Sequence, residues 1–283
     1  MVGIARFVMQ GPRQALILAV LFAALPMMYW ASAAITALVI LRQGTTPGIN
    51  VLLAALLPGI AWYAAQQEIT VIAVLLGTAI MAVVLRQTVS LANALIASWI
   101  VGAGTVLLLP VVSEQWYAML EQGASVYLDA ISKQMPEAKD SIEPWVLPML
   151  LGGVSALMQV FSIGSLLLAR YWQAKLYNPG GFSQEFHQLR LPYWYTVAAI
   201  LVLLVGISSV QFVAWVPLAL VPFFISGISV VHCIVKKKKM SSQWLFMFYV
   251  SLVFFLPYMY ALLILVALLD ALVDIRKRLK DTA

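Results

Sequence analysis

The sequence predicts an all-α polytopic membrane protein, a helical bundle of eight to ten transmembrane segments in a single membrane domain over residues 1–283. Composition is the first reason: 63% of the residues are hydrophobic and only 10% are charged, whereas a soluble domain carries about 25% charged residues. The second reason is that apolar runs long enough for a spanning helix recur along the whole chain. The third is a sparse, mainly basic charge, 17 Lys and Arg against 11 Asp and Glu, which in membrane proteins gathers in cytoplasmic loops.

The same numbers exclude several classes of protein. So few charged residues cannot coat a soluble enzyme, and so apolar a chain is not disordered. One cysteine, Cys233, and two histidines, His187 and His232, are too few for an internal disulfide or a multi-ligand metal site. The chain has no phosphate-binding loop, no HExxH and no GxSxG motif. We therefore expect no cofactor and no enzymatic activity.

Eight apolar runs define the expected elements in order. They cover residues 14–41, 48–65, 69–85, 89–112, 146–169, 193–210, 212–235 and 243–275. The first and last runs are too long for one simple span, and each has a proline near its middle, Pro26 and Pro257. Because proline removes a backbone donor and disfavours helix in the residue before it, each of these runs is either one kinked helix or a hairpin of two short helices.

The placement of charge favours hairpins. If the Lys236–Lys239 run is cytoplasmic, counting the spans backwards places residues 113–145 outside, where six acids face two lysines. With a hairpin at each end, both termini are cytoplasmic and 15 of the 17 basic residues lie inside. We therefore prefer ten short crossings of a bacterial inner membrane, although residues 27–41 would rise only about 22 Å. Eight long spans with both termini outside remain the alternative.

The start of the chain also imitates a cleaved signal peptide, with Arg6, Arg13 and the Ala31-Ser32-Ala33 triplet around an apolar stretch. Because seven further apolar runs follow, we expect a retained helix instead.

Within the external acidic loop 113–145, the pattern of residues 114–135 predicts an amphipathic helix. Apolar side chains recur at helical spacing at Trp116, Leu120, Tyr127, Leu128, Ile131 and Met135, and Pro136 ends the pattern. The segment is either a lid or docking surface for an envelope partner, or an interfacial helix that lies on the bilayer. We favour the interfacial helix.

The cytoplasmic segment 170–192 is the most distinctive stretch of the chain. Its candidate site residues are Arg170, Trp172, Asn178, Gly180, Gly181, His187 and Arg190. The run Asn178-Pro179-Gly180-Gly181 indicates a tight turn, because glycine adopts positive φ readily. Two interpretations stay open: a cytoplasmic site or coupling element, and an interfacial hairpin whose bases meet anionic lipid.

The last apolar run carries the charges closest to a span interior. Asp270, Asp274 and Arg278 are spaced four residues apart, so they share one helix face. We favour acids that reach the cytoplasmic boundary and pair there with Arg278 or Lys277. The alternative is a polar contact that grips another helix or a partner.

Small residues predict close helix contacts near the N-terminus. Ala15, Ala19 and Ala23 share one face, and Ala33 and Ala37 share another. Small side chains at this spacing let helix backbones approach one another in a membrane.

Three stretches carry a family resemblance. WASAAITALVILRQG near the start, ARYWQAKLYNPGGFSQEFHQLRLP in the middle and LLDALVDIRKRL at the end resemble the YybS-like family of predicted bacterial inner-membrane proteins, a domain of unknown function. That family is distantly similar to the substrate-binding subunits of energy-coupling-factor vitamin transporters, which bind a small molecule in a helical bundle and dock onto a coupling subunit through small-residue helix faces. The resemblance implies such a docking role for the five alanines. The chain departs from those subunits in having more apolar runs and a large acidic loop.

Two main functional hypotheses follow, and an enzyme that acts on lipid is the third. The first is a membrane protein that binds a small apolar or lipid-like molecule, similar to a transporter subunit and dependent on a protein partner for any energised step. The second is a non-transporting scaffold that recruits envelope or cytoplasmic partners through its two loops. The lipid bilayer is the one certain partner. Nucleic acid is not expected, because the lysine run has no interleaved aromatic residues on which bases could stack.

Overall fold

The computed structural model describes residues 2–278, and every regular element in that range is a helix. The first half of the chain forms α1 (Val2–Val8), α2 (Pro12–Ala24), α3 (Tyr29–Gln43), α4 (Thr45–Gln66), α5 (Thr70–Thr88), α6 (Leu91–Ala97), α7 (Trp99–Val112) and α8 (Glu114–Gln134). The second half forms the 3-10 helix η1 (Pro136–Ala138), then α9 (Lys139–Tyr177), α10 (Gly181–Gln188), α11 (Tyr193–Ser208), α12 (Trp215–Lys237), α13 (Ser242–Phe254), α14 (Leu256–Val273) and α15 (Ile275–Arg278). The all-α prediction is confirmed.

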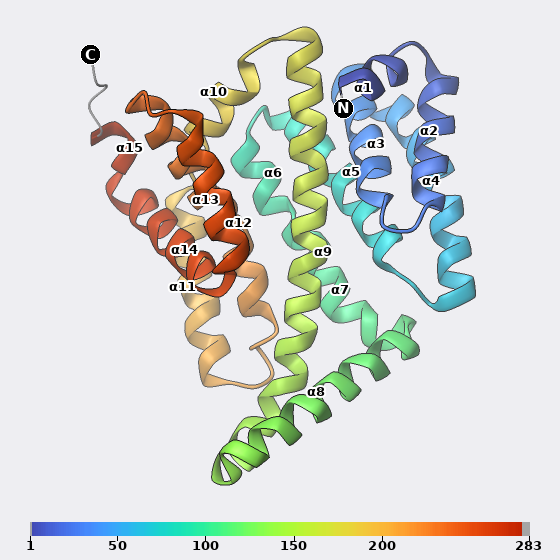
Figure 1. The fold of residues 1–283 in the computed structure, drawn as a ribbon. Coiled ribbons are helices and arrows are strands. Elements are labelled where there is room, and N and C mark those ends of the chain that lie inside the picture. Colours follow the sequence, from blue (N-terminus) through green and yellow to red (C-terminus); the bar gives the residue numbers. More distant parts are fainter. Residues whose placement is uncertain (1, 279–283) are drawn as a thin grey trace.

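Helix α9 is the central element of the bundle. It stands between the N-terminal helices α1–α5 and the C-terminal helices α11–α15 (Figure 1), and it packs against α3, α5, α7, α8 and α12. Its 39 residues rise about 58 Å, so it extends well beyond a hydrocarbon core of about 30 Å. Gly152 lets α9 meet the chain just before α12, because a Cβ there would lie 2.4 Å from the carbonyl oxygen of Ala214.

The structure is that of a multi-pass membrane protein. By length and composition, six helices among the described residues can cross a membrane: α4, α5, α6 with α7, η1 with α9, α12 and α14. A seventh crossing results if α10 and α11, which meet at 56°, form one broken span. The preferred count of ten crossings is therefore too high.

The two long terminal runs break where their prolines predicted. The first separates into α2 and α3 around Leu25–Met28, and the last separates into α13 and α14 at Phe255. The resulting α2, α3 and α13 have only 13, 15 and 13 residues. Helices of that length rise about 20–22 Å, less than the hydrocarbon core, which is the physical reason why the predicted count of crossings was too high.

The hairpin of α2 and α3 is embedded in the N-terminal half. Helix α3 packs against α2, α4, α5 and α9, and 12 of its 15 residues are buried. The hydroxyl of Ser32 donates a hydrogen bond of 2.7 Å to the carbonyl oxygen of Ala19, which ties the two helices together. The five alanines of the predicted docking face, Ala15, Ala19, Ala23, Ala33 and Ala37, are at most 1% exposed. They serve close packing within the chain and offer no surface to a partner, because this chain's own helices cover them.

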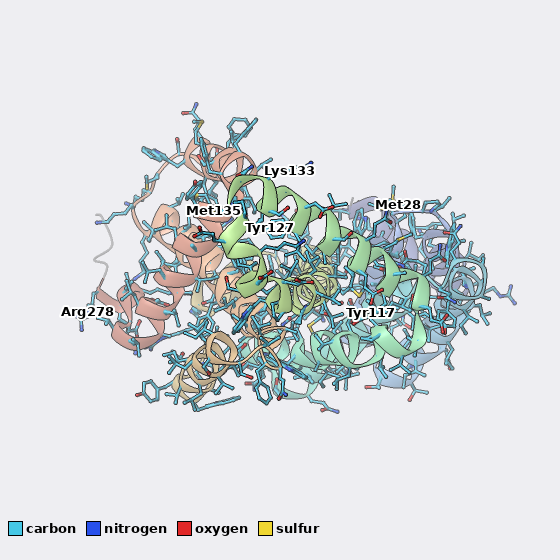
Figure 2. The ribbon with its side chains drawn as sticks, turned by 90° about the horizontal axis from the view of Figure 1, so that it is seen from below. Met28, Tyr117, Tyr127, Lys133, Met135 and Arg278 are labelled. Carbon is cyan, nitrogen blue, oxygen red and sulfur yellow. The ribbon has the colours of Figure 1, made fainter. Side chains whose placement is uncertain are left out.

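Different elements cover the two ends of the bundle. Helix α8 runs across one end, as Figure 2 shows from below, with Tyr117 toward the N-terminal helices and Met135 at its far end. Helices α1, α10 and α15 lie at the opposite end (Figure 1). The acidic segment therefore occupies one end, and the turn between α9 and α10 occupies the other.

Candidate functional site

A buried ion pair joins α14 to α15. The side chain of Asp270 is fully buried, and its Oδ2 accepts a hydrogen bond of 2.9 Å from Nε of Arg276, itself only 7% exposed. The backbone N–H of Arg276 donates to the other carboxylate oxygen at 3.3 Å. An uncompensated charge at this depth would be costly, so each partner makes burial of the other tolerable.

Arg276 also holds two other helices. Its Nη1 donates to the carbonyl oxygen of His187 at 2.7 Å and to the hydroxyl of Ser229 at 3.0 Å, and its Nη2 donates to the carbonyl oxygen of Ser226 at 3.4 Å. The hydroxyl of Ser229 in turn donates to the carbonyl oxygen of Phe186. One guanidinium therefore connects the end of α10, the middle of α12 and the start of α15.

Arg190 adds a second ion pair beside the first. Its Nη1 lies 2.9 Å from Oδ2 of Asp274, and its Nε and Nη2 donate to the carbonyl oxygens of Asp270 and Ala271 at 3.1 and 2.8 Å. These carbonyl groups belong to the last turn of α14, so the cation also complements the negative end of that helix. We call Arg190, Asp270, Asp274 and Arg276 the ionic clasp.

The electrostatics of Asp274 are dominated by its cations. Burial alone would raise the pKa of this carboxyl group, but hydrogen bonds from Lys277 and the charges of Arg190 and Lys277 outweigh burial and lower that pKa below its ordinary value. The second salt bridge, from Nζ of Lys277, is 3.1 Å long. Asp274 is therefore ionised at neutral pH.

Asp270, Asp274 and Arg278, which were predicted to share one helix face, have different partners in the structure. Asp270 is buried and pairs with Arg276, so it does not extend to the membrane boundary as predicted. Asp274 pairs with Lys277 and Arg190. Arg278 is exposed, and its Nε donates to the carbonyl oxygen of Val273 at 3.1 Å. The two acids thus grip other segments of the same chain.

The predicted site residues of segment 170–192 do not form one site either. Only His187 and Arg190 reach the clasp. Arg170 pairs with Glu185 and donates to Oε1 of Gln173 at 3.1 Å, and Trp172 is buried in the core.

The turn between α9 and α10 accounts for the remaining three residues of that segment. Gly180 has φ of +90°, which favours glycine. A Cβ on Gly181 would lie 2.4 Å from Nδ2 of Asn178. These residues shape a connection, and the clasp lies beyond it.

A cavity of about 270 Å³ lies at the end of the molecule that carries α8. We call it the hairpin cavity, because the break between α2 and α3 forms one wall. Its lining is Leu25, Pro26, Met27 and Tyr29 from that hairpin, Trp62, Gln66, Glu68, Thr70 and Val71 from α4, α5 and their connection, and Trp116 from α8. Three aromatic rings, from α3, α4 and α8, and one carboxylate, from the connection between α4 and α5, thus converge on this cavity.

Hydrogen bonds fix the start of α8 beside this cavity. The hydroxyl of Ser113 donates to the carbonyl oxygen of Gln67 at 2.8 Å, and the backbone N–H of Gln115 donates to Oε1 of Gln67 at 2.9 Å. The hydroxyl of Tyr63 donates to the carbonyl oxygen of Val112 at 2.7 Å. These contacts involve the residues directly before Trp116, so they anchor the first turn of the helix that carries its ring.

The other walls of the cavity are ordered too. Tyr29 is buried, and its ring packs edge-on against Phe161 of α9 at 5.8 Å between centroids. Oε1 of Glu68 accepts a hydrogen bond of 2.8 Å from the backbone N–H of Thr70, which leaves a carboxylate oxygen with further capacity to accept.

A larger apolar groove of about 550 Å³ has fewer groups that could recognise a ligand than the hairpin cavity has. It lies between α5 and α7, and its lining has two hydroxyl groups, those of Tyr63 and Thr105. Both donate to carbonyl groups of the chain, Tyr63 to Val112 at 2.7 Å and Thr105 to Val101 at 2.9 Å. The groove suits a lipid chain, but it lacks a polar group that would recognise a particular molecule.

The sequence analysis missed the hairpin cavity. One signal was present: Glu68 is the sole acidic residue among residues 1–113, and Trp62 stands six positions before it. Arg276 was also missed as a clasp residue, because it sits in a cluster of bases that resembles a simple topology signal.

Within residues 2–278, no group of three or more His, Cys, Asp or Glu side chains gathers as a metal site. Comparison of the chain with protein-family models, with curated proteins and with solved structures finds no match.

Proposed function

We propose that this chain is a binding protein of the bacterial inner membrane that holds a small, mostly apolar or lipid-like molecule in the hairpin cavity. The observation that carries the proposal is the convergence of Tyr29, Trp62, Trp116 and Glu68 on one cavity. Ligand sites are typically concave and mostly apolar, with a few polar groups that fix orientation. The hairpin cavity has that composition.

The lining also indicates the chemistry of the ligand. Aromatic rings accept apolar bodies and cations on their faces, and Glu68 is the single charged residue of the lining. A ligand with an apolar body and a cationic or hydrogen-bond-donating group fits this combination. An anionic ligand does not, because Glu68 would repel it.

The proposal also covers the orientation of the chain in the membrane and the source of energy for any transport step. The end with α8 faces the outside, and both termini are cytoplasmic, because cytoplasmic loops of membrane proteins carry an excess of Lys and Arg. The chain has no nucleotide-binding motif, so an energised step would need a coupling subunit, as the resemblance to YybS-like proteins and energy-coupling-factor subunits implies. Such a partner would dock elsewhere than on the buried alanines.

Native mass spectrometry of the protein released from its own membranes tests the proposal. We expect a bound small molecule on the natural chain and at least tenfold lower occupancy on Trp116→Ala. The control is Trp194→Ala, because Trp194 is 60% exposed on α11 and does not line the cavity. Equal occupancy in the two variants would contradict the proposal.

The exposed face of α8 supports a second candidate function, that of a scaffold. Met119, Val126 and Tyr127 on this helix, and Met135 directly after it, are all more than half exposed, and a bilayer surface or a partner can cover them. Loss of a co-purifying protein after deletion of residues 114–143, with small-molecule occupancy absent throughout, would favour the scaffold.

A further inference from the structure

A second cavity, of about 490 Å³, adjoins the ionic clasp at the end opposite α8. Its charged lining consists of Arg190, Lys236, Lys237, Arg276, Lys277 and Asp274. Gln184, Gln188 and His187 of α10 and Cys233 of α12 complete it. We call it the basic pocket. Among the described residues that line it, five are cationic and one is a carboxylate, so the lining has a clear excess of positive charge.

The internal carboxylates do not remove that excess. Asp270 lies behind the wall and is engaged by Arg276, and Asp274 is shared between Arg190 and Lys277. Lys236 is exposed at the end of α12 and faces the same space. An exposed cation therefore stands at the pocket for an entering anion.

The positive wall is also preorganised. Hydrogen bonds to the carbonyl oxygens of Asp270, Ala271 and His187 hold the guanidinium groups of Arg190 and Arg276. Charges held in this way need little rearrangement when an anion arrives. Amide groups of Gln184 and Gln188 add neutral donors beside the cations.

We infer that the basic pocket binds a phosphate group. Phosphate matches the site because it carries more than one negative charge and several strong acceptor oxygens, which arginine and lysine recognise together. Basic pockets between membrane helices on the cytoplasmic side are also where phospholipid headgroups bind. The inference does not need a ligand in the hairpin cavity, which lies at the other end of the bundle. Only the cytoplasmic placement of the basic pocket rests on the proposed orientation.

Binding can be measured on the purified full-length chain in phosphatidylcholine nanodiscs at constant ionic strength. One arm adds inorganic phosphate, with chloride as the matched salt, and follows the thermal unfolding midpoint. The other arm replaces one fifth of the lipid by phosphatidylglycerol and counts retained lipids by native mass spectrometry. A response to phosphatidylglycerol alone identifies a lipid headgroup as the source, and a response to phosphate alone identifies a soluble compound.

The matched variants are Lys236→Gln and Lys238→Gln. Both lysines are exposed in the same run, but only Lys236 lines the pocket. We expect Lys236→Gln to weaken binding about tenfold, the size of one lost charge-assisted contact, and Lys238→Gln to leave binding unchanged. Absence of binding in both arms, or equal weakening by the two variants, would overturn the inference, because equal weakening indicates a diffuse surface charge.

Discussion

At the scale of single residues, the ionic clasp is the most specific arrangement in the molecule. It brings together Arg190, which follows α10, with Asp270 and Asp274 at the end of α14. An ion pair buried near a membrane needs good geometry, because removing two charges from water is expensive. The clasp meets that need with backbone carbonyl groups and the hydroxyl of Ser229 around its arginines.

We predict that Asp270→Asn lowers the free energy of unfolding by about 3 kcal/mol, because it leaves the guanidinium of Arg276 buried without its counter-charge. Reversible unfolding in mixed detergent micelles measures this change. Asp274→Asn is the matched control: its carboxylate is more exposed than that of Asp270, so the loss should be smaller. The double variant Asp270→Leu with Arg276→Met should recover most of the lost stability, because it removes both charges. A stability of Asp270→Asn equal to that of the natural chain would show that the pair is not needed.

The sequence predicts part of this site and not the rest. Charge near the end of an apolar run marks Asp270 and Asp274, and an unusual loop marks His187 and Arg190, yet nothing local shows that these two groups meet. They lie about eighty positions apart in the chain, and only the packing of α10, α12 and α14 brings them together. The same holds for Tyr29 and Trp116 at the hairpin cavity.

At the scale of elements, the prolines locate the helix breaks but do not determine the number of crossings. Pro26 and Pro257 lie at or beside the breaks of the two terminal runs. Hydropathy cannot tell whether an apolar helix faces lipid or protein, so α3 reads as a membrane span although its neighbours enclose it. Packing in the structure separates the two cases: 12 of the 15 residues of α3 are buried, whereas no residue of α13 is.

A close helix crossing gives the prediction at this scale. A Cβ on Gly227 of α12 would lie 2.3 Å from the carbonyl oxygen of Leu263 on α14. Gly227→Ala should therefore lower the free energy of unfolding by about 1–3 kcal/mol, because the two helices must separate. Gly164→Ala is the control, since a Cβ there meets no heavy atom within 4 Å, and it should be neutral or stabilising. Equal effects of the two substitutions would show that α12 and α14 do not cross this closely.

At the scale of the whole molecule, the two ends have opposite character. The acidic segment and the hairpin cavity share one end, and the clasp and the basic pocket share the other. The proposed orientation puts the first end outside. This arrangement would place the two candidate ligand sites on opposite sides of the membrane.

Cysteine labelling in intact cells measures that orientation. In a Cys233→Ala background, a membrane-impermeant maleimide should label Ser125→Cys on α8 and should not label Gly3→Cys on α1. Permeabilised cells provide the control, because both positions should then react. Labelling of Gly3→Cys from outside would reverse the proposed orientation and with it the assignment of both termini to the cytoplasm.

The central claim is that the hairpin cavity holds a small molecule, and photo-cross-linking in the native membrane tests it most directly. A photoactivatable side chain in place of Gln66 would sit in the cavity lining, and the same side chain in place of Ser125 would sit on the exposed surface of α8. After irradiation, mass spectrometry of the protein should find one small-molecule adduct at position 66 that is absent at position 125. Identical phospholipid adducts at both positions, or a cross-linked protein at position 66, would contradict the account.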